Sequence, residues 1–146
     1  MRETTRIIIA DRHALVRQAL RSLISSHKAL KVVGEAQDGK EVVAVVAKLK
    51  PDLLVMELAL PMVNDLDALK EIKRRCPEMK VLVVAVQDCK EHVLACFEAG
   101  ADGCMLKNDS CPELLRAIAT VLRGKIYLCR AVLQVLEQVI EGNGRA

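Results

Sequence analysis

The sequence predicts an α/β domain in which helices cover both faces of a doubly wound parallel sheet. Short β-branched runs alternate with longer amphipathic segments five times along the 146 residues. Strands joined through helices pair in parallel with right-handed crossovers. The length fits one ordinary domain, and an apolar content of 52% with 28% charged residues is typical of a folded chain.

The first strands and helices follow from the local apolar pattern. Residues 6–10 form a β-branched run of the kind that parallel sheets bury on both faces. Apolar residues at helical spacing follow over residues 13–26. Residues 31–36 alternate like a strand near the edge. The spacing of the valines in residues 42–49, with Lys and Glu nearby, favours a second helix.

The middle of the chain repeats this order. Residues 53–56 are expected as a third strand that ends at Glu57, and residues 61–64 as a loop. Residues 66–73 carry helical spacing, which the proline at position 77 ends. The pattern therefore predicts a third strand and a third helix.

The second half of the chain contains two further strands and three helices. Residues 80–86 are the clearest buried strand, and residues 103–106 form a shorter one. Helical spacing is found in residues 90–99, 112–122 and 130–141. The last of these segments is an extra amphipathic helix.

Composition and charge argue against several classes of function. The 22 basic and 19 acidic residues are spread along the chain, and a net charge of +3 is too small to indicate nucleic-acid binding. Phe97 and Tyr127 are the only aromatic residues, so a base-stacking surface has no side chains to form it. No apolar run reaches the roughly 18–20 residues that span a bilayer, and the first residues lack a signal-peptide layout. We therefore expect a cytoplasmic protein with no membrane partner.

The six cysteines are expected to be small buried hydrophobic residues. They form no C-x-x-C pair, and no histidine stands at a zinc-ligand spacing beside them. A redox switch among those near the strand ends would need a lowered thiol pKa. The six are Cys76, Cys89, Cys96, Cys104, Cys111 and Cys129.

Polar residues gather where the predicted strands end, which is where open α/β sheets bind ligands. Asp11 and Arg12 follow the first strand, and Glu57 follows the third. Ala85 lies near the end of the fourth strand, and Lys107 follows the fifth. Two carboxylates and a lysine are therefore expected in one crevice. Small-molecule binding there is one class of function, but no glycine-rich loop follows the first strand to support a nucleotide.

Five segments resemble the receiver domain of response regulators of the NarL/FixJ type. They are residues 10–17 (ADRHALVR), 33–36 (VGEA), 50–52 (KPD), 56–61 (MELALP) and 99–103 (AGADG). They occur in the order and at the spacing of that family, which the chain resembles from about residue 6 to 130. The resemblance implies a flavodoxin-like fold with a five-stranded parallel sheet in the order 2-1-3-4-5 and five helices, to which this chain adds a C-terminal helix.

The resemblance also implies a chemistry. In the family, an aspartate after the third strand accepts a phosphoryl group from a histidine kinase, and an acidic pair after the first strand binds Mg²⁺. A Ser or Thr after the fourth strand and a lysine after the fifth contact the phosphoryl oxygens. A carboxylate attacks phosphorus only if the developing charge is neutralised, and the metal ion supplies much of that neutralisation.

This sequence departs from the family pattern at four positions. Glu57 stands at the phosphoacceptor position on a side chain about 1.5 Å longer than aspartate, and in-line displacement is intolerant of such a shift. Arg12 stands at the second acidic position, where a guanidinium cannot bind Mg²⁺. Ala85 replaces the hydroxyl residue that contacts the phosphoryl group, and Cys104 replaces the aromatic residue that moves on activation.

Asp11 and Lys107 alone keep the expected residue types. We interpret the chain as a pseudo-receiver and not an enzyme, with Mg²⁺ binding lost or weak. Two arrangements stay open: Arg12 and Lys107 hold both carboxylates in a metal-free ionic cluster, or Arg12 points into solvent and Glu57 pairs with Lys107 alone. His13 is expected to pack at the helix start or to face solvent. The functional alternatives are a phosphorylatable receiver that uses Glu57, or a phosphomimetic receiver that is constitutively active.

The predicted organisation is a receiver domain over residues 1–128, a terminal helix over residues 129–141 and the start of a linker over residues 142–146. A protein partner or a second copy is expected on the helix-four, strand-five, helix-five face or on the terminal helix, and a histidine kinase is a further expected partner. Complete NarL/FixJ regulators continue into a helix-turn-helix domain of roughly 60 residues. DNA is therefore expected to bind only a domain absent from this chain, and truncation is favoured over a stand-alone receiver.

Overall fold

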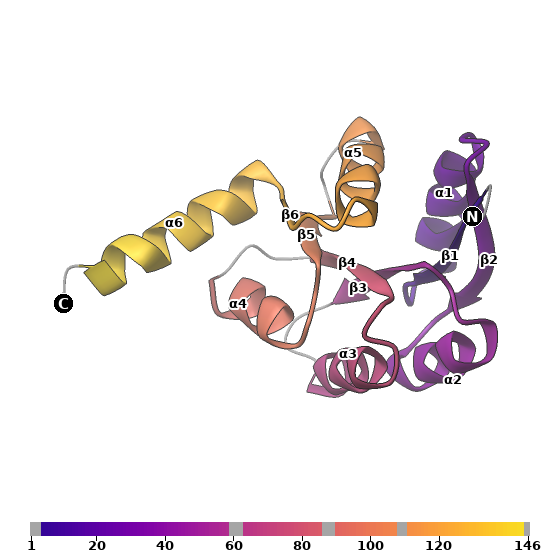
Figure 1. The fold of residues 1–146 in the computed structure, drawn as a ribbon, viewed down its shortest axis with the longest axis horizontal. Coiled ribbons are helices and arrows are strands. Elements are labelled where there is room, and N and C mark those ends of the chain that lie inside the picture. The colour runs from indigo at the N-terminus through magenta and orange to yellow at the C-terminus, as the bar shows by residue number, and fades with distance from the viewer. Residues whose placement is uncertain (1–3, 59–62, 86–89, 108–110, 145–146) are drawn as a thin grey trace.

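The fold is a six-stranded parallel sheet covered by helices on both faces (Figure 1). The computed structural model describes residues 4–58, 63–85, 90–107 and 111–144. The strands are β1 (Thr5–Ala10), β2 (Leu30–Ala36), β3 (Leu53–Leu58), β4 (Lys80–Ala85), β5 (Gly103–Leu106) and β6 (Tyr127–Leu128). The helices are α1 (Ala14–Ser25), α2 (Gly39–Leu49), α3 (Val63–Arg75), α4 (Lys90–Glu98), α5 (Cys111–Leu122) and α6 (Arg130–Gly144).

The strand order is β2-β1-β3-β4-β5-β6, so the predicted order is confirmed and one strand is added at the far edge. The added strand β6 pairs in parallel with β5 through Gly103 and Cys104. Two residues are too few to show the alternation by which strands are recognised in a sequence. Packing beside β5 therefore created a strand that the sequence pattern did not indicate.

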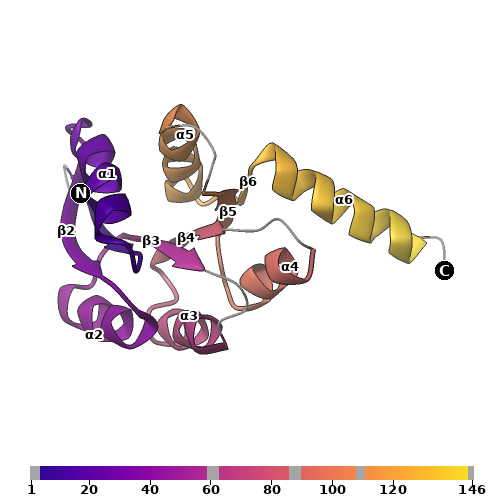
Figure 2. The same cartoon turned by 180° about the vertical axis from the view of Figure 1, so that it is seen from behind.

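The helices form two layers. Figures 1 and 2 show α1 and α5 on one face of the sheet and α2, α3 and α4 on the other. The terminal helix α6 extends away from the body, and its near part contacts α4 and β5. None of the helices in the described part of the chain is long and apolar enough to cross a membrane.

The core is aliphatic, and β3 lies at its centre with all six residues buried. The isoleucines of β1 beside it are fully buried too. Among the residues that the structure describes, Asp11 and Glu57 are the only buried charged residues. Burying a charge is costly unless it is paired and hydrogen-bonded, so these two carboxylates mark a functional-site candidate.

Two aspartates from the segments that resemble the receiver family lie at the amino ends of the strands, opposite the edge where Asp11 and Glu57 lie. An Asp52 carboxylate oxygen accepts the backbone N–H of Arg6 at 2.8 Å. Asp102 accepts the backbone N–H of Val81 at 2.8 Å and pairs with Lys73 at 3.1 Å. Both aspartates therefore bind backbone groups at strand starts, which is a structural role far from the strand ends where the site lies.

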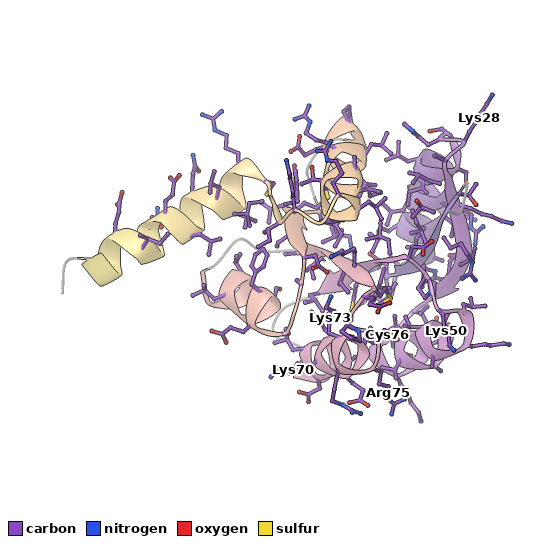
Figure 3. The ribbon with its side chains drawn as sticks, viewed as in Figure 1. Lys28, Lys50, Lys70, Lys73, Arg75 and Cys76 are labelled. Carbon is purple, nitrogen blue, oxygen red and sulfur yellow. The ribbon has the colours of Figure 1, made fainter. Side chains whose placement is uncertain are left out.

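Basic side chains of α3 lie in different environments on its two sides. Figure 3 shows Lys70 and Arg75 on the outer side of α3 and Lys73 between α3 and the sheet. Lys73 also donates to the carbonyl oxygen of Met79 at 2.8 Å, so its ammonium is held by backbone and carboxylate oxygens. The aliphatic part of a lysine can pack on apolar neighbours while its charged end stays paired.

Three predicted boundaries were wrong. Residues 63–64 begin α3 and do not belong to a loop, while positions 61–62 lie outside the described residues. β3 continues past Glu57 to Leu58, because Leu58 still pairs with Ala85 of β4. Residues 142–144 continue α6, so this helix ends later than the predicted residue 141. Two glycines in a last helical turn weaken a helix without forbidding it.

Candidate functional site

The site lies at the carboxyl ends of three strands, as the sequence predicts. Asp11 directly follows β1, Glu57 is the second-last residue of β3, and Lys107 directly follows β5. The backbone N–H of Lys107 donates to the carbonyl oxygen of Ala85 at 2.9 Å, which anchors it at the end of β4. Ala85 is fully buried and carries only a methyl group, so the long lysine side chain passes the end of β4 and reaches β3.

Lys107 joins the two buried carboxylates. Its Nζ donates to Glu57 Oε1 at 2.8 Å and lies 3.4 Å from Asp11 Oδ2. The carboxylate side chains are 3% and 2% exposed, whereas that of Lys107 is 26% exposed. The partly exposed ammonium therefore offsets part of the negative charge of two carboxylates that are largely shielded from water, and such pairing is what allows a buried charge to be tolerated.

Arg12 stays at the rim of the site. Its Nε lies 3.9 Å from Glu57 Oε2, at the outer limit of an ion pair, and its side chain is 40% exposed. Its backbone N–H donates to the same oxygen over a long 3.4 Å. The geometry lies between the two predicted arrangements, because Glu57 pairs closely with Lys107 while Arg12 adds a distant charge.

His13 contacts the same cluster, a role that the sequence analysis did not assign to it. Its Nδ1 lies 3.3 Å from Asp11 Oδ1 and 3.5 Å from Lys107 Nζ. Its backbone N–H donates to Asp11 Oδ1 at 2.7 Å, and it stands at the N-cap of α1. An aspartate side chain commonly accepts the backbone N–H of the residue two positions later in the chain. The spacing of Asp11 and His13 could therefore have indicated this contact from the sequence.

The electrostatics of the cluster keep Lys107 protonated. Burial lowers the pKa of Lys107, but its hydrogen bond to Glu57 and the negative charges of Asp11 and Glu57 outweigh burial, so the pKa is raised above its usual value. Opposite charges within hydrogen-bond distance favour the charged form of an amine. The ammonium is therefore a permanent part of the cluster at neutral pH.

The donor atoms fit a magnesium ion poorly. Asp11, His13 and Glu57 each offer one ligand atom, and these atoms lie within 4.8 Å of one another. One of the three donors is a nitrogen, whereas Mg²⁺ takes oxygen ligands in octahedral geometry. The Lys107 ammonium already lies within 3.5 Å of all three residues, so a metal ion there would have to displace a protein cation.

Cys104, at the position of the switch aromatic, lies on the α4 side of the sheet. It is fully buried, and its thiol shares a hydrogen bond with Cys96 of α4, which lowers the pKa of Cys96. Cys76, Cys96, Cys104 and Cys129 are free thiols, and burial is confirmed for the last three, while Cys76 is half-buried. Cys89 and the side chain of Cys111 lie outside the described residues.

The geometry and the strand order agree with the family indicated by the sequence. The family model of the response regulator receiver domain matches residues 7–119. The chain belongs to this family. This receiver domain is similar to the nitrate/nitrite response regulator NarL of Escherichia coli (strain K12), with 30% identity over 141 residues, covering 97% of this chain and 65% of NarL. It is also similar to the transcriptional regulatory protein DegU of Brevibacillus brevis, with 31% identity over 122 residues, covering 84% of this chain and 52% of DegU.

Comparison with solved structures also identifies response regulators as similar proteins. A two-component response regulator of the LuxR family from Aurantimonas sp. SI85-9A1 superimposes with a TM-score of 0.87 at 30% identity, covering 94% of this chain and 99% of that one. The resemblance based on five segments is thus confirmed across nearly the whole receiver domain. The chain spans about half to two-thirds of the length of the two curated relatives.

Proposed function

We propose that this chain is a pseudo-receiver domain that signals through protein contact and not through phosphoryl transfer. The observation that carries the proposal is the composition of the cluster, in which Lys107 and Arg12 face Asp11 and Glu57. A receiver needs an acidic pair and an acceptor around a divalent cation. Here protein cations pair with the two acids.

We expect Mg²⁺ binding to be lost or weak. A guanidinium at the second acidic position replaces an oxygen ligand with a fixed positive charge. Without the metal ion, the charge that develops on the transferring phosphoryl group would depend on protein cations, of which Lys107 lies closer to Glu57 than Arg12 does. That lysine is already engaged with Glu57 at 2.8 Å.

Two further positions support the proposal. Glu57 lies inside β3, so its longer side chain extends beyond the place an aspartate would reach and loses in-line geometry. Ala85 offers no hydroxyl to a phosphoryl oxygen. Each change weakens a different part of the reaction, so the effects of these changes combine.

The negative charge of Glu57 beside Lys107 favours a second candidate, a phosphomimetic receiver held in one active state. That state would have to be transmitted by the residues that read the phosphoryl group. Ala85 has no polar side-chain atom, and Cys104 is hydrogen-bonded within the core. The pseudo-receiver is therefore the better supported function.

The output is proposed to pass through the α4-β5-α5 face or through α6. Leu133 and Ile140 of α6 are 42% and 69% exposed, and their spacing of seven residues places them on the same side of the helix. NarL and DegU are named as regulators and are longer than this chain. We infer that the intact protein is a transcriptional regulator whose DNA contacts lie in another domain, with a second copy or a protein partner on these surfaces.

The test is intact-mass spectrometry after incubation with acetyl phosphate and Mg²⁺. The wild-type chain is expected to gain no phosphoryl group. The triple variant Arg12→Asp, Glu57→Asp, Ala85→Thr restores the family residues and is expected to gain one. A phosphoryl adduct on the wild-type chain that is lost in Glu57→Gln would overturn the proposal and establish a receiver that uses Glu57.

A further inference from the structure

A cavity of about 220 Å³ lies beside the cluster on the face of the sheet that carries α1 and α5. Val16 and Leu20 of α1 form one wall, and Leu114 of α5 belongs to the opposite helix. Val84 and Met105 of the sheet form the floor. Figures 1 and 2 show the two helices side by side on this face. Most of the lining is therefore aliphatic, and it comes from α1, α5 and several strands of the sheet.

One end of the cavity is polar. Asp11, Glu57 and Lys107 line it there, which gives two acids and one base, while the half-exposed Arg12 is not among the lining residues. Carboxylate oxygens are acceptors only, so a ligand group that meets them has to donate a hydrogen bond. An anionic group would face two buried carboxylates, and like charges in a poorly solvated site repel strongly.

We propose that this cavity binds a small molecule with an apolar body and a hydrogen-bond donor, best an ammonium group, at one end. An apolar cavity of about 150 Å³ takes up benzene, so the space here accommodates a single substituted ring or a short branched chain. Ligand pockets combine apolar walls with a few polar groups that orient the ligand, and this cavity has that composition. The proposal goes beyond the pseudo-receiver function, which requires no small molecule.

A bound molecule would touch α1, α5 and the ionic cluster together. Occupancy therefore links the two helices on one face of the sheet to the site that receives the phosphoryl group in other members of the family. A ligand shifts a conformational equilibrium only if it binds one arrangement better than another. Here that difference would come from the separation of α1 and α5, which sets the width of the cavity.

The experiment compares three probes of similar size and different charge: 2-phenylethylamine, 2-phenylethanol and 3-phenylpropionate. Methionine methyl groups are labelled with ¹³C and followed by NMR during titration. Met105 lines the cavity, whereas Met79 is buried before β4 at the opposite edge of the sheet and serves as the internal control. We expect the amine to shift the Met105 resonance saturably, the alcohol to do so more weakly, and Met79 to stay unchanged.

A matched pair of variants tests the location. Ala19 is an exposed residue of α1 that lines the cavity, and Ala19→Leu adds bulk there without altering the cluster. Ala47, which is exposed on α2, gives the control Ala47→Leu. The dissociation constant for the amine is expected to rise at least tenfold in Ala19→Leu and to stay unchanged in Ala47→Leu.

Three results would overturn the proposal: no saturable shift at Met105, equal binding of the carboxylate and the amine, or unchanged binding in Ala19→Leu. The comparison of the three probes on the wild-type chain tests the proposal even if Ala19→Leu folds poorly. No phosphate donor enters this experiment. Its failure therefore leaves the pseudo-receiver proposal standing, and a phosphoryl adduct on Glu57 would leave the cavity proposal standing.

Discussion

The ammonium of Lys107 reaches across the end of β4 and donates to Glu57 Oε1 at 2.8 Å, although β4 separates their two strands. The small side chain of Ala85 at the end of β4 permits this reach. The contact couples the third and fifth strands through one charged hydrogen bond. Charge-assisted hydrogen bonds are roughly twice as strong as neutral ones, so this pair is expected to dominate the energetics of the site.

The first prediction concerns the pairing of Lys107 with Glu57. Lys107→Met leaves two buried carboxylates without their closest cation and is expected to lower the free energy of unfolding by about 1–3 kcal/mol. Glu57→Gln removes one charge and is expected to cost less. The double variant should recover part of the loss, which chemical denaturation of all four proteins measures as a coupling energy. Strictly additive effects would show that the two side chains do not interact in solution.

The second prediction concerns alkaline pH. The pKa of Lys107 is raised in the folded chain, so the folded state holds its proton more tightly than the unfolded state. The resulting stabilisation is fully present below the ordinary lysine pKa of about 10.4 and is lost as pH rises through the higher folded value. Denaturation at a series of pH values from neutral to strongly alkaline measures the loss.

The matched control for that measurement is Lys107→Met, because it keeps every other group that titrates at high pH. The difference in stability between wild type and variant is expected to shrink above the ordinary lysine pKa. A difference that stays constant through that range would contradict the assignment of the raised pKa to Lys107.

The third prediction separates Arg12 from Arg17, which both lie near Asp11. Arg12 is half-exposed and 3.9 Å from Glu57, so Arg12→Ala is expected to change stability by less than about 1 kcal/mol. Arg17 is 17% exposed, pairs with Glu35 at 3.1 Å and donates to the Asp11 carbonyl oxygen at 2.6 Å. Arg17→Ala is therefore expected to cost more. The reverse order in thermal unfolding would place Arg12 inside the cluster in solution.

The fourth prediction concerns thiol reactivity. Cys76 is half-buried and is expected to react with iodoacetamide faster than Cys96, Cys104 and Cys129, which are buried. Peptide mapping by mass spectrometry resolves each site separately. Rapid labelling of Cys104 under native conditions would contradict its packing against Cys96, and denaturant should equalise the rates.

Much of the fold could be predicted because the relevant signals are local. The β-branched run of β1 and the amphipathic spacing of α1 each lie within a short window, and a parallel sheet follows from their alternation. Local patterns failed to predict the structure where pairing with a neighbouring strand determines it. The strand β6 exists because it lies beside β5, and the end of β3 depends on the pairing of Leu58 with Ala85.

The candidate site divides in the same way. Residue types at strand ends were sufficient to bring Asp11, Glu57 and Lys107 together, since parallel strands end at one edge. Types alone left two arrangements open for Arg12 and left His13 outside the cluster. Their positions depend on side-chain torsions and on the start of α1, which no spacing in the chain specifies.

The order of residues along the chain thus established the class of fold, the family and the identity of the groups at the crevice, because periodicity and residue chemistry are carried by neighbouring positions. Packing decided that Lys107 takes Glu57 as its close partner, that Arg12 stays at the rim, and that a cavity remains between α1 and α5. These features depend on distances between elements far apart in the chain, and such distances exist only once the helices have settled on the sheet.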